Sequence, residues 1–152
     1  DGLVVKGARG ISVQADTTLA EVAGRTFDLI VLPGGMPGAA NLAASALLCD
    51  MLKKQRAEGR MIAAICAAPA VVLHPLGLLG DEKTSCYPAF QRRLDDVNRT
   101  EERLCVGEKL ITAAGPGVAM EFALALAERL KGKEKADELA GAMLVERYCG
   151  DE

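Results

Sequence analysis

The stretch MIAAICAAP, residues 61–69, indicates how this 152-residue chain folds. Its first five residues form a short apolar run after the polar break at 58–60, which is typical of a buried strand. Pro69 then stands where the first turn of a helix tolerates a residue without an N–H group. Cys66 is therefore predicted to lie at a strand-to-helix turn, the arrangement that presents the nucleophile in a nucleophile elbow.

Two further apolar runs end in loops rich in glycine and proline. The run 27–32 leads into PGGMPG at 33–38, and the run 110–114 leads into GPG at 115–117. Strands that end in this way before helices form the ligand crevice at the carboxyl edge of an open α/β sheet. We therefore predict an α/β fold in a single domain, residues 1–152, with a mostly parallel sheet and helices on both faces.

The predicted turn would suit Cys66 as a nucleophile. A thiol beside unpaired amides and the positive end of a helix loses its proton more readily, and the thiolate is the reactive form. The amides of Gly34, Gly35 and Ala67 would then be available to an oxyanion. Two plainer interpretations stay open, because Cys66 can be a small core residue and Gly34-Gly35 an ordinary turn.

The chain has five cysteines, at positions 49, 66, 86, 105 and 149. None forms a C-x-x-C pair, and their spacing predicts no metal site. An odd number of scattered cysteines favours reduced thiols in a cytoplasmic setting. Cys86 is predicted to end a short strand near the same sheet edge, where Tyr87, Gly115 and Pro116 would also line the site. A structural role for Cys86 remains the stronger interpretation.

Three other side chains are weaker candidates. His74 follows Cys66 by eight residues, about two helical turns, so we do not expect it to act as a base. Arg9 is expected in a solvated loop. Glu121 lies on a predicted helix, 118–130, that is apolar almost all round and should be buried on most of its surface.

Composition excludes several classes of function. The formal net charge is −3 and no run of Lys and Arg occurs, so nucleic acid is not an expected partner. The apolar stretches are too short to span a membrane. Neither the dinucleotide fingerprint nor the P-loop motif is present, and we predict no cofactor.

Taken together, these motifs resemble those of the ThiJ/PfpI superfamily and, within it, the DJ-one group. The resemblance follows family order over essentially the whole chain and rests on VLPGG at 31–35, IAAICAAP at 62–69, TSCYP at 84–88, GPG at 115–117 and EFAL at 121–124. It implies a flavodoxin-like α/β sandwich that forms a homodimer. It also implies that Cys66 is the reactive, oxidation-prone residue and that the Gly35 and Ala67 amides form its oxyanion pocket.

The sequence departs from the family pattern in two respects. The family's first strand–helix unit, with a glutamate that hydrogen-bonds the cysteine, has no counterpart in these residues. A separate N-terminal peptide is therefore expected to complete the fold, and without it a sheet edge should be exposed. Tyr87 also stands where some relatives carry a histidine, so no histidine can pair with Cys66 there, which argues against a protease.

The resemblance implies an activity on small reactive aldehydes or glycated substrates. Cys66 would add to a 2-oxoaldehyde such as methylglyoxal, and the product would be a hydroxy acid such as lactate, formed without a cofactor. The same chemistry would remove early glycation adducts. The alternative is a redox sensor or redox-regulated chaperone in which Cys66 is oxidised to a sulfinate.

Overall fold

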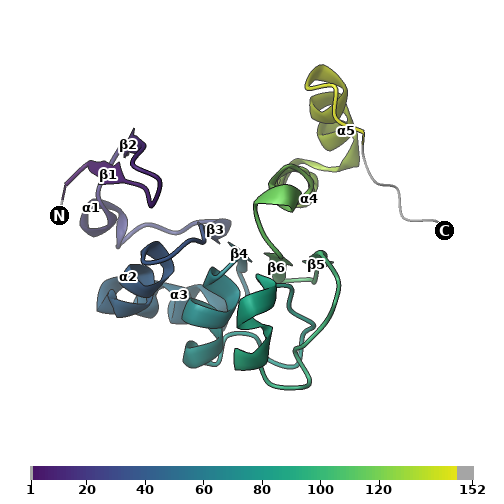
Figure 1. Ribbon diagram of the computed structural model, residues 1–152. Helices are drawn as coiled ribbons and strands as arrows, with labels where there is room; N and C mark the ends of the chain where they lie inside the picture. The colour runs from purple at the N-terminus through teal and green to yellow at the C-terminus, as the bar shows by residue number, and fades with distance from the viewer. Residues whose placement is uncertain (1, 147–152) are drawn as a thin grey trace.

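A four-stranded sheet forms the centre of the computed structural model, which describes residues 2–146. Its strands lie in the order β3 (Leu29–Leu32), β4 (Met61–Ile65), β6 (Leu110–Ala113) and β5 (Leu104–Val106). β3, β4 and β6 are parallel, whereas β5 and β6 form an antiparallel hairpin (Figure 1). The predicted mostly parallel sheet is confirmed.

Helices cover both faces of this sheet, as expected. Ile62 and Ala64 of β4 belong to one buried cluster, and Ala63 belongs to the other, because successive strand residues point to opposite faces. α2, α3 and η1 lie on the first face, and α4 lies on the second with α5 packed against it (Figure 1). The bounds are α1 Leu19–Val22, α2 Gly38–Ala44, α3 Ala46–Ala57, η1 Pro69–Leu73, η2 His74–Leu76, η3 Pro88–Arg93, η4 Pro116–Val118, α4 Ala119–Lys131 and α5 Lys133–Ala142.

The first two strands form a sheet of their own. β1 (Val4–Lys6) pairs antiparallel with β2 (Ser12–Gln14), and the loop that joins them contains Arg9, as expected. Within the described residues this hairpin pairs with no strand of the central sheet. The chain therefore has a small antiparallel sheet in addition to the central one.

Two apolar cores of unequal size hold the central sheet. The larger surrounds Leu52, Ile62 and Leu73, and the smaller surrounds Ile111 and Phe122 beneath α4. The difference in size reflects the number of elements on each face. Two helices and η1 cover the first face, whereas among the described residues the second face is covered by α4 and by Val118 of the preceding η4.

One prediction about α4 is wrong. Its sequence is apolar almost all round, yet its buried residues are Phe122, Leu124 and Leu126, and Met120 is 45% exposed. The reason lies in the packing, because α4 contacts the sheet on one side and α5 on another. A part of its apolar surface has no neighbour among the described residues.

Short-range capping interactions set the ends of two helices. The hydroxyl of Ser45 accepts a hydrogen bond from Leu48 N and begins α3, and Gly59, with φ +67°, follows its end. Thr18 and Glu21 form a complete capping box at α1.

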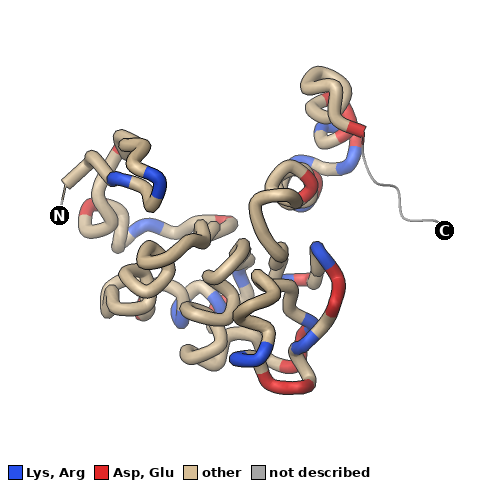
Figure 2. Tube along the Cα trace, in the orientation of Figure 1, with Lys and Arg blue, Asp and Glu red and all other residues tan. Residues whose placement is uncertain are grey.

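Acidic and basic side chains alternate along the surface. Figure 2 shows both signs together on α5 and along the loop that precedes β5. Within residues 2–146, no helix is both long enough and apolar enough to cross a membrane.

Candidate active site

Cys66 lies directly after β4, at the carboxyl edge of the sheet, as predicted. Its φ of +64° is in the left-handed region, which side chains other than glycine rarely adopt. The Cys66 amide donates to the carbonyl of Ala113 at 2.8 Å, and its carbonyl accepts from Tyr87 N at 2.9 Å. These two hydrogen bonds fix the backbone of Cys66 between the end of β6 and the segment 84–87. The half-buried thiol therefore projects from a backbone that is held in place.

The glycine loop after β3 approaches Cys66 closely. A Cβ placed on Gly34 would lie 2.5 Å from Cys66 Cβ, 2.6 Å from Ile65 O and 3.1 Å from Ala67 N. No side chain fits there, so only glycine allows the loop to come this near. The structure therefore brings together the predicted residues Gly34, Cys66 and Ala67.

Two backbone amides of this region have no backbone acceptor. Gly35, with φ +84°, accepts a hydrogen bond from Ala39 N at its carbonyl and so begins α2. In the part of the chain that the structure describes, neither Gly35 N nor Ala67 N donates to a backbone carbonyl. Backbone amides without a carbonyl partner, close to a thiol, are the kind of donor that an oxyanion would need, and the part of Gly35 and Ala67 in binding one stays a prediction.

The helix predicted after Cys66 differs in kind. η1 is a five-residue π-helix, and η2 continues it as a single 3₁₀ turn that contains Pro75. Proline at this point cannot donate to the preceding turn, so a regular helix does not extend through it. A helix this short has only a small dipole. The nearby backbone amides, rather than the helix dipole, are therefore the groups that would stabilise a negative charge at Cys66.

The segment 84–87 lies beside the cysteine but is not the short strand that we predicted. Cys86 is buried, and its thiol donates to the carbonyl of Tyr87 at 3.6 Å. Burial, with a smaller contribution from the neighbouring Cys66, raises the pKa of Cys86 from 9.0 to about 11. Cys86 thus stays protonated at neutral pH and fits the structural role that the sequence favoured.

Tyr87, which follows Cys86, lies close to Gly115. A Cβ on Gly115 would lie 3.5 Å from Tyr87 Cδ2, so the half-exposed tyrosine ring lies close to this glycine. Pro116 begins η4 directly afterwards. The structure therefore groups Tyr87, Gly115 and Pro116 as predicted, and their part in ligand binding stays a prediction.

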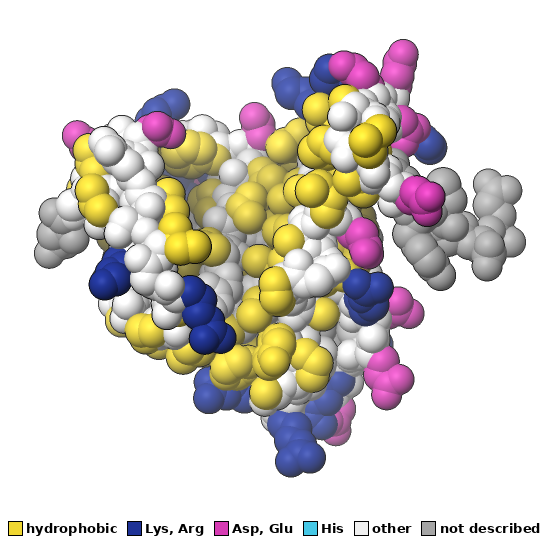
Figure 3. Space-filling view, turned by 45° about the horizontal axis from the view of Figure 1, so that its top comes forward, with side chains coloured by type: hydrophobic (Ala, Val, Ile, Leu, Met, Phe, Trp, Pro, Cys, Tyr) yellow, Lys and Arg dark blue, Asp and Glu magenta, His cyan; other side chains and the backbone are white. Residues whose placement is uncertain are grey.

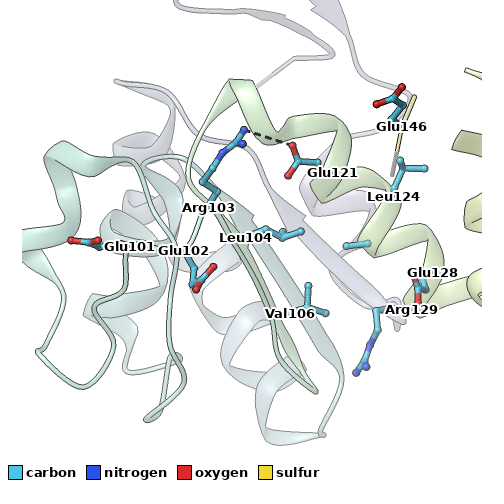
Figure 4. Close-up of a pocket in the computed structure, with 11 residues that line it drawn as sticks. Glu101, Glu102, Arg103, Leu104, Val106, Glu121, Leu124, Glu128, Arg129 and Glu146 are labelled. Atoms are coloured by element: carbon cyan, nitrogen blue, oxygen red, sulfur yellow. Dashed lines mark ion pairs between the residues drawn. The ribbon is translucent and has the colours of Figure 1, made fainter. Parts of the chain in front are cut away.

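The weaker candidates lie elsewhere. Nε2 of His74 is 3.3 Å from a carboxylate oxygen of Asp95. Arg9 is exposed in the loop between β1 and β2. Glu121 faces Arg103 at 3.6 Å in an open groove of about 770 Å³ between β5 and α4 (Figure 4). None of the residues predicted around Cys66 lines this groove.

The remaining cysteines have separate surroundings. The Cys49 thiol donates to the carbonyl of Ala43 at 3.4 Å, and burial raises the pKa of Cys105 on β5. Cys149 lies outside the described residues. Among residues 2–146, no three His, Cys, Asp or Glu side chains are arranged to hold a metal ion.

The sequence did not predict the residues whose hydrogen bonds hold the segment 84–87 in place beside Cys66. The hydroxyl of Thr112, a buried polar residue in the middle of β6, accepts from Ser85 N at 2.9 Å. Ser85 Oγ in turn donates to the carbonyl of Glu102 at 2.7 Å. A threonine within an otherwise apolar strand was the signal that could have identified this support.

Comparisons with known proteins agree on one family. The sequence matches the model of the DJ-1/PfpI family over residues 1–129. It is 43% identical over 149 residues to Protein DJ-1 homolog B of Arabidopsis thaliana. This alignment covers 97% of this chain but only 34% of the plant protein. The chain thus spans about a third of the length of this plant relative.

Two shorter relatives match over more of their own length. The Caenorhabditis elegans protein named Glutathione-independent glyoxalase DJR-1.2 is 36% identical over 137 residues, 89% of this chain and 72% of that protein. The solved structure of oxidized Toxoplasma gondii DJ-1 superposes with a TM-score of 0.93 at 46% identity. This match covers 95% of this chain and 79% of that one.

Proposed function

The chain belongs to the DJ-1/PfpI family, and from this premise we propose that it is a cysteine-dependent enzyme for reactive 2-oxoaldehydes. The observation that carries the proposal is the position of Cys66 between the glycine loop and the Ala67 amide. That a relative of this chain bears the name of a glutathione-independent glyoxalase supports the choice of substrate.

The reaction begins with addition of the Cys66 thiolate to the aldehyde carbon of methylglyoxal. A C–S bond forms, the C=O π bond breaks, and the charge moves to oxygen, where the Gly35 and Ala67 amides would stabilise it. Transfer of hydrogen from the aldehyde carbon to the ketone carbon then gives a thioester of lactate. Water hydrolyses the thioester and restores the thiol.

The overall reaction needs no external oxidant or reductant. The aldehyde carbon is oxidised while the neighbouring ketone carbon is reduced, and one water molecule is consumed. The same addition step would act on early glycation adducts of proteins. A dimer, expected from the family resemblance, remains a prediction that sedimentation of the purified chain can check.

Turnover of methylglyoxal to lactate by the 152-residue chain tests the proposal. We expect Cys66→Ser to abolish lactate formation, because the serine hydroxyl is protonated at neutral pH and a far weaker nucleophile. Cys49→Ser is the matched control, since it changes another half-buried thiol. Equal lactate formation by Cys66→Ser and the unaltered chain would contradict the proposal.

A redox sensor is the second candidate, and the same two amides favour it. Two molecules of hydrogen peroxide would convert the Cys66 thiolate to a sulfinate and release two of water, and the amides would bind the sulfinate oxygens. A sulfinate at Cys66 by mass spectrometry, without lactate formation before oxidation, would favour the sensor over the enzyme.

A further inference from the structure

The open groove between β5 and α4 lies on the far side of the central sheet from β3. One wall is β5 with the residues before it, and the other is a face of α4 on which Glu121, Leu124 and Glu128 follow one another at helical spacing (Figure 4). Figure 3 shows a hydrophobic depression between the β1–β2 hairpin and α4–α5, but no residue of the hairpin lines the groove. The groove is therefore a separate feature, and the reaction proposed at Cys66 does not use it.

β5 forms an open edge of the central sheet beside the groove. It pairs with β6 alone, and within residues 2–146 no strand lies on its other side. Ala114 N donates to the carbonyl of Arg103 at 2.8 Å, so Arg103 faces β6. Because the residues of an antiparallel strand face their partner alternately, the N–H and C=O groups of Leu104 and Val106 point away from β6. These backbone groups can pair with another extended chain.

The floor of the groove is apolar. Leu104 and Val106 lie two residues apart on β5, so their side chains are on the same face of the strand. Leu124 and Ala125 of α4 line the groove with them (Figure 4). Val106 is 53% exposed, which leaves apolar surface that a bound chain would cover. A strand paired with β5 would place every second side chain on this floor.

The rim of the groove is acidic. The glutamates that line it are Glu101, Glu102, Glu121, Glu128 and Glu146. Its two arginines already have partners, because Arg103 lies 3.6 Å from Glu121 and Arg129 donates to the carbonyl of Glu108. In the described part of the chain, neither Glu101 nor Glu102 forms an ion pair with Lys or Arg. The excess of acidic groups favours a basic partner.

We propose that this groove binds an extended segment of another protein, which pairs with β5 as an added strand and carries basic side chains beside its apolar ones. Main-chain hydrogen bonds to Leu104 and Val106 would provide affinity, and the apolar floor and acidic rim would select the side chains. The stretch of α4 from Glu121 to Arg129 is about 12 Å long, the length of about four residues of an extended chain.

Charge argues against a second copy of this chain as the occupant. Two β5 strands that paired antiparallel with Leu104 opposite Val106 would place Glu102 opposite Glu108 of the other copy. Like charges directly opposite each other are destabilising. The net charge of −3 also opposes self-association at an acidic groove. A basic segment meets neither obstacle.

The test measures binding of a blocked heptapeptide to the 152-residue chain. The peptide has lysines at both ends, valines at its third and fifth positions and threonines between them, so its lysines and valines share one face of a strand. In one control peptide glutamate replaces both lysines, and in another proline replaces the central threonine and removes a backbone donor. We expect the lysine peptide to bind at least tenfold more tightly than either control.

Hydrogen exchange and two matched variants locate the binding. The lysine peptide should slow exchange of residues 104–106 at least tenfold and leave residues 29–32 on the opposite edge unchanged. Glu102→Lys reverses a charge at the rim and should weaken binding at least tenfold. Asp50→Lys makes the same change of charge at an exposed position of α3, on the other face of the sheet, and should change binding less than twofold.

Several results would overturn the proposal. They are absence of binding, equal binding of the lysine and glutamate peptides, equal binding by the two variants, and protection of residues 29–32 instead of 104–106. Protection of 104–106 that rises with the concentration of the chain alone would also overturn it, since a second copy would then fill the groove. None of these readouts depends on lactate formation at Cys66.

Discussion

Gly34 carries no side chain, and this determines how near the loop after β3 comes to Cys66. An added methyl would lie 2.5 Å from Cys66 Cβ and 2.6 Å from the Ile65 carbonyl, so the loop would have to move. We expect Gly34→Ala to lower the free energy of unfolding by about 1–3 kcal/mol. Lactate formation should fall at least tenfold, since the amides would leave their positions.

Urea unfolding and lactate assays measure these two effects. Gly38→Ala is the matched control, because nothing lies within 4 Å of the added methyl and the residue begins α2. Activity retained in both variants would show that the close approach of Gly34 is not needed for the chemistry.

At the scale of the elements, Gln55 joins α3 to the start of two strands. Its buried amide donates to the carbonyls of Phe27 and Met61 at 2.9 Å each and accepts from Arg60 Nε at 3.0 Å. Gln55→Leu would leave two carbonyls without this donor, at a cost of about 1–3 kcal/mol. Thermal unfolding measures this loss of stability, with Lys53→Ala on the exposed face of α3 as the control. Equal stability of the two variants would contradict the prediction.

Phe122 connects α4, and through it α5, to the sheet. It is buried in the smaller core with Ile111 and Val118. We expect Phe122→Ala to lower the free energy of unfolding by about 3–5 kcal/mol. Hydrogen exchange should speed up more over residues 119–142 than in β4. Met120→Ala on the same helix removes an exposed side chain and should have little effect.

The local elements were predictable where one short-range signal decides them. β4 begins and ends where its apolar run does, and α3 begins after the cap residue Ser45 and ends just before Gly59. The extent of burial on α4 was not, because an apolar helix gives no information on how many neighbours cover it. In the site too, residues placed by short-range signals were predictable, and those placed by tertiary contacts were not.

Cys66, Gly34 and Ala67 were predictable because a strand end brings them together. Thr112 was not, since its contact with Ser85 spans 27 residues and depends on tertiary packing. The division of the strands into two sheets likewise depends on long-range pairing rather than on the local pattern.

For the molecule as a whole, the buried Cys86 thiol makes stability depend on alkaline pH. The pKa of Cys86 is raised to about 11 in the folded protein, whereas the unfolded thiol loses its proton near pH 9. Above pH 9 the unfolded state therefore binds fewer protons, and this contribution to stability is lost as pH rises toward 11. The loss amounts to at most about 3 kcal/mol.

Urea unfolding at several pH values between 8 and 10.5 checks this. Cys86→Ala should show a smaller decline with pH than the unaltered chain, whatever its stability at pH 8. Cys49→Ala should keep the steeper decline. Parallel curves for Cys86→Ala and the unaltered chain would exclude Cys86 as the cause.

The left-handed backbone of Cys66 affects how substitutions at this position change the stability of the protein. A residue with a Cβ at this position costs roughly 1–2 kcal/mol relative to glycine, a noticeable part of the 5–15 kcal/mol that stabilises a typical domain. Cys66→Gly should therefore unfold at a higher temperature than Cys66→Ala, and thermal unfolding of the two variants checks this. A change that makes the protein more stable would at the same time remove the thiol that the proposed reaction requires, so selection for stability and selection for the proposed thiol chemistry would oppose each other at this residue.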